Sequence, residues 1–220
     1  MAPVLLFSMV AHEYAHGYAA LRQGDPTAYQ LGRLTWNPVK HIDPFMTVLL
    51  PLMTFFLGGF IFGGAKPVPV NPRNYKNFRR GDIIVSLAGV VTNLILAGVF
   101  TILIALLGVI GKAVPIAAAT LGILQYMLLT GVFFNLVLVF FNLIPIPPLD
   151  GSHVVKYLLP PAWSLRYQQI GMYGMFILIA LLTVGRPVLS AWLSPMYSIF
   201  SSAQRVVVPY MLPTPFLGPL

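Results

Sequence analysis

The chain contains no cysteine, and it has few charged residues of either sign. Without cysteine, disulfides, thiolate metal sites and cysteine nucleophiles are excluded. Charged residues make up 8% of the 220 residues, and hydrophobic residues make up 58%. An ordinary soluble domain carries about 25% charged residues, and a disordered chain has low hydrophobicity, so both classes are excluded. The composition therefore predicts an integral membrane protein.

Acidic residues are the scarcest charged class. Five Asp and Glu residues stand against 13 Lys and Arg, which gives a formal net charge of +8. Nucleic-acid binding is one interpretation of this excess. In a membrane protein, positive loops held on the cytoplasmic side explain it better, so we expect no nucleic-acid partner. Glu13 is the only glutamate, and it lies inside an apolar run.

Four apolar runs are long enough to cross a bilayer as helices, namely 2–21, 83–111, 116–143 and 167–185. Two further runs are ambiguous, because prolines interrupt both 45–65 and 187–204. We expect an all-α polytopic membrane protein with about four to six membrane segments. The chain is expected to be one transmembrane domain over residues 1–220, with its core in 1–160 and C-terminal membrane segments in 161–220.

Loop charge predicts the topology. Basic residues lie both before and after 45–65, and the positive-inside rule prefers both segments on one side, so 45–65 is expected to be a re-entrant loop. Residues 2–21 would then run from outside to the cytoplasm, 83–111 outward, 116–143 back and 167–185 outward again. We expect the protein in the cell (inner) membrane of a prokaryote.

The first apolar run carries the sequence His12-Glu13-Tyr14-Ala15-His16. On a helix, residues i and i+4 share one face, so His12 and His16 can bind the same metal ion. Zinc suits two imidazoles and a carboxylate, and it keeps a fourth position open for water. Glu13 is then expected to act as the general base. Polar packing between helices is the alternative, but ionisable residues are costly at this depth and are functional by default.

The third ligand can be sought by elimination. A second glutamate is absent, and position 22, where a longer histidine motif would need His, is Arg. Asp25 and Asp43 precede prolines and are typical of turns or caps. Asp82 follows a glycine at an expected helix start, which indicates an N-cap. The two other histidines, His41 and His153, are expected at the membrane interface, with contact to the metal or its surroundings as the alternative.

Asp150 is the preferred third ligand. It ends a run in which Pro145, Pro147 and Pro148 stop the preceding helix, which delivers an acid at the cytoplasmic end of 116–143. The alternative is that Asp150 caps a helix beginning at Gly151. Two asparagines within the expected spans, Asn93 and Asn135, are expected either to line the site cavity or to hydrogen-bond between helices.

The sequence resembles the site-2 protease family of intramembrane zinc metalloproteases. The resemblance covers roughly residues 5–160 and rests on H-E-Y-A-H at 12–16, F-N-L-I-P-I-P-P-L-D-G at 141–151 and G-G-A-K-P-V-P-V-N-P at 63–72. It is closest to a short form, with neither a PDZ insertion nor a C-terminal nucleotide-sensing domain. The family's usual A-G-P reads Ala88-Gly89-Val90 here, a departure expected to affect packing and not the zinc site.

The resemblance implies hydrolysis of peptide bonds in transmembrane segments near the cytoplasmic face, as in regulated intramembrane proteolysis. It implies one zinc ion per chain on His12, His16 and Asp150, with Glu13 as base and Asn142 helping to bind the substrate. The partners implied are a transmembrane protein or peptide substrate and the lipid bilayer. Residues 63–70 are expected to form a small membrane-associated β element on which an unwound substrate pairs as an added strand.

Two other functions are considered. A non-catalytic metal-binding membrane protein or transporter would usually carry further acidic or His residues along a path through the membrane, and Glu13 would be unnecessary in it. A different HExxH membrane protease, such as a prenyl-protein endopeptidase, would need a second glutamate, which is absent.

Overall fold

The computed structural model describes residues 2–58 and 63–213, and within these two ranges the regular structure is helical, with no strand. Short 3-10 and π turns, labelled η, separate the α-helices. The α-helices are α1 (Ala2–Gln23), α2 (Thr27–Gln30), α3 (Leu50–Gly58), α4 (Phe78–Ala113), α5 (Ala118–Asn142), α6 (Asp150–Val155), α7 (Pro161–Ile170), α8 (Gly174–Thr183) and α9 (Arg186–Val207). The turns are η1 (Pro38–His41), η2 (Pro44–Leu49), η3 (Pro72–Asn74), η4 (Pro115–Ala117), η5 (Gly171–Tyr173) and η6 (Val208–Tyr210).

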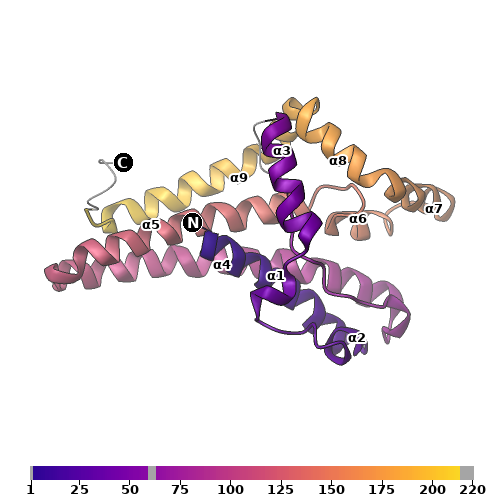
Figure 1. Ribbon diagram of the computed structural model, residues 1–220, viewed down its shortest axis with the longest axis horizontal. Helices are drawn as coiled ribbons and strands as arrows, with labels where there is room; N and C mark the ends of the chain where they lie inside the picture. The colour runs from indigo at the N-terminus through magenta and orange to yellow at the C-terminus, as the bar shows by residue number, and fades with distance from the viewer. Residues whose placement is uncertain (1, 59–62, 214–220) are drawn as a thin grey trace.

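The long helices α4 and α5 form the centre of the molecule. They lie side by side and run in opposite directions, because the turn at 114–117, which contains Pro115, reverses the chain (Figure 1). α1 crosses the same pair, and α9 packs along α5 (Figure 1). Their shared core consists of apolar side chains from α4, α5 and α9: Ala97, Phe100, Ile104, Leu129, Val132, Leu136, Met196 and Val207.

Three helical stretches are long and apolar enough to cross a membrane: Phe78–Ala113, Pro115–Asn142 and Pro161–Thr183. They correspond to three of the four expected spans, although the last begins six residues before the predicted 167 and passes through η5. The fourth expected span forms helix α1, whose 22 residues extend about 33 Å. Its central His-Glu-His cluster makes it less apolar than the other three. The expected total of four to six segments is therefore not confirmed beyond these three.

The two ambiguous runs are both helical where they are described. Residues 44–58 form η2 and α3, and 59–62 lie outside the described residues, so the re-entrant loop stays a prediction. α9 continues through Pro195 as one helix and packs along α5.

The segment 63–71 leads back from α3 toward α4 and carries no regular structure. The β element expected here is therefore unconfirmed. Pro67 and Pro69 have no N–H to give to a strand ladder, and the N–H of Val68 between them donates to the side chain of Glu13 at 2.8 Å. The guanidinium of Arg33 donates to the carbonyls of Lys66 and Pro67. Side-chain bonds thus hold this segment against α1 through Glu13 and against the loop after α2 through Arg33.

Candidate metal centre

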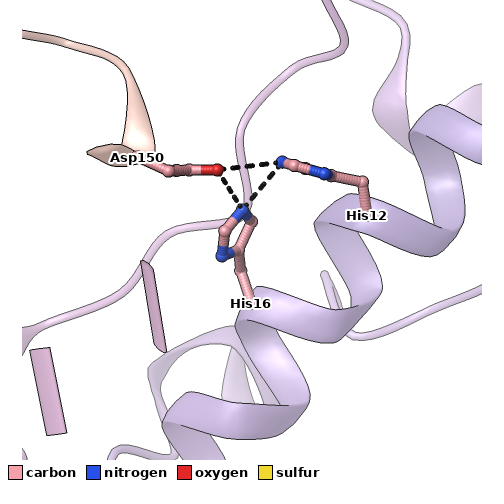
Figure 2. Close-up of side chains that lie close together, drawn as sticks. All are labelled: His12, His16 and Asp150. Atoms are coloured by element: carbon pink, nitrogen blue, oxygen red, sulfur yellow. Dashed lines mark hydrogen bonds and ion pairs between the residues drawn. The ribbon is translucent and has the colours of Figure 1, made fainter. Parts of the chain in front are cut away.

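His12 and His16 lie one turn apart on α1, and Asp150, the first residue of α6, faces them from the other side (Figure 2). The two Nε2 atoms are 3.0 Å apart. Oδ2 of Asp150 lies 3.2 Å from Nε2 of His12 and 3.4 Å from Nε2 of His16. His12 is buried, and the other two residues are largely buried. One side-chain atom from each of the three residues therefore lies within 3.4 Å of the other two.

These separations fit a zinc ion. Ligands about 2.0–2.1 Å from a tetrahedral zinc lie about 3.3–3.4 Å from one another. The three separations in the cluster are 3.0, 3.2 and 3.4 Å, so small movements would complete the coordination. Two imidazoles and one carboxylate also leave a fourth position open, as in catalytic zinc sites.

The hydrogen bonds on the far side of each ring leave the facing nitrogens without protons. Nδ1 of His16 lies 2.7 Å from the backbone oxygen of Val85, which can only accept, so Nδ1 carries the hydrogen. Nδ1 of His12 lies 2.7 Å from Oδ1 of Asn93, another acceptor. Oδ2 of Asp150 is buried and accepts no hydrogen bond. Three electron-pair donors therefore meet with no proton between them, an arrangement that a cation stabilises.

The charge of Asp150 also suits a metal ligand. Burial alone would raise the pKa of its carboxyl. Positive charge or a hydrogen bond on the side of His12 and His16 outweighs burial and holds that pKa well below its usual range, and a metal cation in that place would act in the same direction. The carboxylate is therefore ionised at neutral pH. Asp150 does not act as a helix cap, since Leu149 occupies the N-cap position of α6 and makes no side-chain cap bond.

Gly89 of α4 leaves the space that the two imidazoles occupy. A Cβ at this position would lie 2.6 Å from Nε2 of His12 and 2.6 Å from Nε2 of His16. We expected the Ala88-Gly89-Val90 stretch to affect packing alone. Val90 is indeed buried in the helix packing, but Gly89 borders the imidazoles of His12 and His16. The sequence could not indicate this role, because a glycine among other small residues of a helix is typical of close helix packing.

Asp82 ties α6, which carries Asp150, to α4. The expectation that Asp82 caps a helix is wrong, because α4 begins at Phe78 and the side chain of Asn77 caps it. Asp82 is buried in the first turns of α4. Its carboxylate accepts from Tyr157 Oη at 2.9 Å and pairs with Lys156 Nζ at 2.6 Å and His153 Nδ1 at 3.2 Å. The short loop after α5 and this network together place α6.

Glu13 lies beside the cluster on α1 and is half-buried. Its Oε2 accepts the hydrogen bond from the N–H of Val68 at 2.8 Å. Val68 is itself buried against Gly17, where a Cβ would come within 2.9 Å of its Cγ1. The carboxylate of Glu13 is thus held between α1 and the segment 63–71.

The other residues named from the sequence lie elsewhere. Nδ2 of Asn142 donates to the carbonyl of Leu138 in its own helix, at 3.0 Å. His41 is buried, and its Nε2 lies 2.9 Å from the carbonyl of Thr35. His153 contacts Asp82. Over the described ranges 2–58 and 63–213, the metal-competent group of His, Cys, Asp and Glu side chains consists of His12, His16 and Asp150.

Comparison with known proteins gives one matching family model, described as peptidase family M50, over residues 1–114 and 105–182. A Bacillus subtilis protein named "Putative zinc metalloprotease YwhC" is 41% identical over 177 residues, which cover 80% of this chain and 77% of the relative. A Mycolicibacterium smegmatis protein named "Putative zinc metalloprotease Rip2" is 32% identical over 194 residues, covering 85% of this chain and 67% of the relative. The Mycobacterium tuberculosis protein of the same name is 31% identical over 187 residues, with the same two shares. No solved structure matches the chain.

Proposed function

The chain belongs to peptidase family M50, the site-2 proteases, and we propose that it is a zinc metalloendopeptidase that cuts peptide bonds within transmembrane segments. The observation that carries the proposal is the convergence of three ligand atoms, from His12, His16 and Asp150, beside the only glutamate of the chain. These three residues hold one zinc ion per chain. Zinc, when bound, supplies a Lewis acid that polarises a carbonyl and lowers the pKa of water toward about 7.

Glu13 acts as the general base in this proposal. The N–H of Val68 holds Oε2, so the other carboxylate oxygen is left to take a proton from the attacking water. The protonated Glu13 then gives that proton to the nitrogen of the leaving amine. Glu13 follows His12 directly on α1, so the same helix that carries the ligands positions the base.

The substrate approaches along the segment 63–71. A transmembrane helix hides its peptide bonds in its own hydrogen bonds, so it must unwind before cleavage. The segment is not helical, and it lies next to Glu13 through Val68, which supports its use as a pairing edge for an unwound substrate. Asn142, at the end of α5, contacts the substrate once its amide leaves the carbonyl of Leu138.

The site faces the cytoplasmic side of a cell membrane, which in a prokaryote is the inner membrane. α4 is about 54 Å long, well over the roughly 30 Å of a bilayer core, so one of its ends projects into the interface. Most of the basic residues lie in 22–80, before α4 and in its first turn, and in 156–166, after α6. The positive-inside rule then orients the end that carries the metal centre toward the cytoplasm. The whole chain acts as one membrane domain.

The test is cleavage of a membrane-anchored substrate by the purified protein in lipid. Glu13→Gln should lower kcat by about 100-fold or more, because the proton acceptor is lost, while bound zinc stays near one ion per chain. Chelation should abolish the activity of the wild-type chain, and added zinc should restore it. Asp43→Asn is the matched control, since Asp43 caps η2 away from the cluster and should not alter the rate.

Two results would overturn the proposal. Cleavage by Glu13→Gln at the wild-type rate would remove Glu13 from the mechanism. A wild-type chain that binds zinc but cleaves no membrane-anchored substrate would instead indicate a non-catalytic metal-binding membrane protein or transporter.

A further inference from the structure

A string of buried polar side chains leads away from the metal centre behind His12. Ser8 and His12 belong to α1, Asn93 to α4 and Asn135 to α5. Nδ1 of His12 lies 2.7 Å from Oδ1 of Asn93, and Nδ2 of Asn93 lies 2.9 Å from Oδ1 of Asn135. Nδ2 of Asn135 lies 2.8 Å from Oγ of Ser8. Ser8, Asn93 and Asn135 are each 0% exposed, so water does not reach the string.

Two backbone carbonyls set the direction of every hydrogen bond in this string. Nδ2 of Asn135 also lies 2.8 Å from the carbonyl oxygen of Gly131, which only accepts, so the amide nitrogen of Asn135 must point there. The hydroxyl of Ser8 donates to the carbonyl of Val4 at 2.9 Å, so Oγ of Ser8 accepts from Asn135. Oδ1 of Asn135 is therefore left to accept from Asn93.

The same reasoning fixes the proton on His12. Because Nδ2 of Asn93 donates to Asn135, Oδ1 of Asn93 faces His12 as an acceptor. Nδ1 of His12 must then carry the hydrogen, and a neutral imidazole with Nδ1–H has its lone pair on Nε2. Nε2 is the atom that faces Asp150 at 3.2 Å.

We propose that Asn93 is a positioning residue for the metal, and that Asn135 and Ser8 fix the orientation of its amide. The string holds the ring of His12 in one tautomer and one rotation, with the lone pair of Nε2 directed at the metal position. This inference rests on the proposed zinc site, and it assigns to Asn93 no contact with substrate. The structure thereby favours one of the two alternatives for Asn93 and Asn135: they bond between helices, and they do so to serve His12.

The second histidine does not depend on such a string. Nδ1 of His16 bonds directly to the backbone carbonyl of Val85, which no side-chain substitution removes. His12 relies on the side-chain amide of Asn93, whose oxygen and nitrogen are similar in size, although the oxygen accepts hydrogen bonds and the nitrogen donates them. A neighbour is therefore needed to keep that amide from turning over, and Asn135 is that neighbour. Without Asn93, the hydrogen of His12 is free to move to Nε2, where zinc must displace it.

Gln125 serves as a control, because it bonds between segments but lies away from His12. It is also a buried amide of α5, and it also bonds between segments, through the carbonyls of Ile104 and Tyr210 and the N–H of Leu212. Gln125 lies ten residues from Asn135 along α5, and its partner Ile104 lies eleven residues from Asn93 along α4. Loss of either amide should destabilise the fold, but loss of Gln125 should leave zinc binding unchanged.

The test is the zinc dissociation constant of the full chain in lipid, measured by competition with a chromophoric chelator and without substrate. Asn93→Leu should weaken zinc binding by about 10- to 100-fold, the usual effect of removing the partner of a ligand histidine. Asn93→Asp keeps an acceptor for Nδ1–H of His12 but loses the donor to Asn135, so it should bind zinc more tightly than Asn93→Leu. Asn135→Leu should give a smaller loss than Asn93→Leu, and Gln125→Leu should give none. Cobalt substituted for zinc should change its visible spectrum in Asn93→Leu and not in Gln125→Leu.

Wild-type zinc affinity and cobalt spectrum in folded Asn93→Leu would overturn the inference. An equal loss of affinity in Gln125→Leu would also overturn it, since the effect would then come from general destabilisation. If Asn93→Leu fails to fold, Asn135→Leu against Gln125→Leu decides the question by the same criterion. Full proteolytic activity in Glu13→Gln would overturn the proposed function and leave this inference standing, whereas a wild-type chain that binds no zinc would overturn both.

Discussion

The carboxylate of Glu13 accepts a hydrogen bond from the backbone N–H of Val68, 55 residues further along the chain, at 2.8 Å. This bond joins the helix that carries both histidines to the segment 63–71, which is proposed to receive the substrate. One contact thus fixes the proposed base and sets its distance from that segment. A change in the position of 63–71 would therefore also change the position of the base.

Val68→Pro removes the N–H donor and keeps an extended backbone. We expect kcat to fall by about 10- to 100-fold, because a misplaced base loses much of its contribution, while zinc content stays unchanged. Val68→Ala is the control, since it keeps the N–H and loses only packing against Gly17. Equal rates for Val68→Pro and Val68→Ala would show that the bond does not position the base.

Gly89→Ala should damage the metal centre. The new Cβ would lie 2.6 Å from Nε2 of both His12 and His16, so the rings must move. We expect about 10-fold or greater loss of zinc affinity and a cost of about 1–3 kcal/mol in folding free energy from overpacking. Gly98→Ala on the same helix meets nothing within 4 Å, so it should bind zinc normally. Chelator competition measures the zinc affinity of the two variants, and thermal unfolding measures their stability. Identical zinc affinities would contradict this prediction.

Asp82→Asn should loosen α6. It leaves Lys156 without its buried partner, and breaking such a pair costs about 3–5 kcal/mol. Because α6 begins with Asp150, we also expect weaker zinc binding. Asp25→Asn is the matched control, since Asp25 is a buried carboxylate whose hydrogen-bond partners lie outside α6. Loss of stability in both variants with loss of zinc affinity only in Asp82→Asn is the expected pattern. Equal zinc affinities of Asp82→Asn and Asp25→Asn would show that the Asp82 network does not position Asp150.

Asp25 should make the stability of the fold depend on pH. Burial alone would raise the pKa of its carboxyl, but hydrogen bonds from the backbone of Asn71, from Thr27 and from Asn74 outweigh burial and lower that pKa. A lowered pKa stabilises the folded chain above the unfolded value of about 3.9, and this contribution is lost as the pH falls through the folded value. Asp25→Asn should therefore be less stable than wild type by about 1–3 kcal/mol at pH 7.

The difference between the two chains should shrink below about pH 4, as the wild-type carboxyl takes up a proton. Unfolding midpoints of both proteins between pH 7 and pH 3 measure it. A difference that stays constant over this range would mean that the charge of Asp25 does not contribute.

Much of the site could be predicted because it depends on local geometry. His12 and His16 share a face because four residues make about one helical turn. The prolines from Pro145 to Pro148 end α5 at Asn142 and place Asp150 at the start of the next helix, since proline cannot continue the preceding one. The low charge content likewise indicated apolar spanning helices, three of which the structure contains. Each of these inferences needs only the neighbours of a residue in the chain.

The structure decided everything that depends on how one helix is rotated against another. Asn93 lies 81 residues from His12, and Asp82 lies 75 residues from Tyr157. Asp82 was mistaken for a cap because a helix that begins four residues earlier, at Phe78, turns the same side chain into its neighbour instead of its own backbone. Gly89 looked like a packing residue for the same reason. Sequence spacing fixes which residues share a helix face, but only the packing of α1, α4, α5 and α6 determines what that face meets.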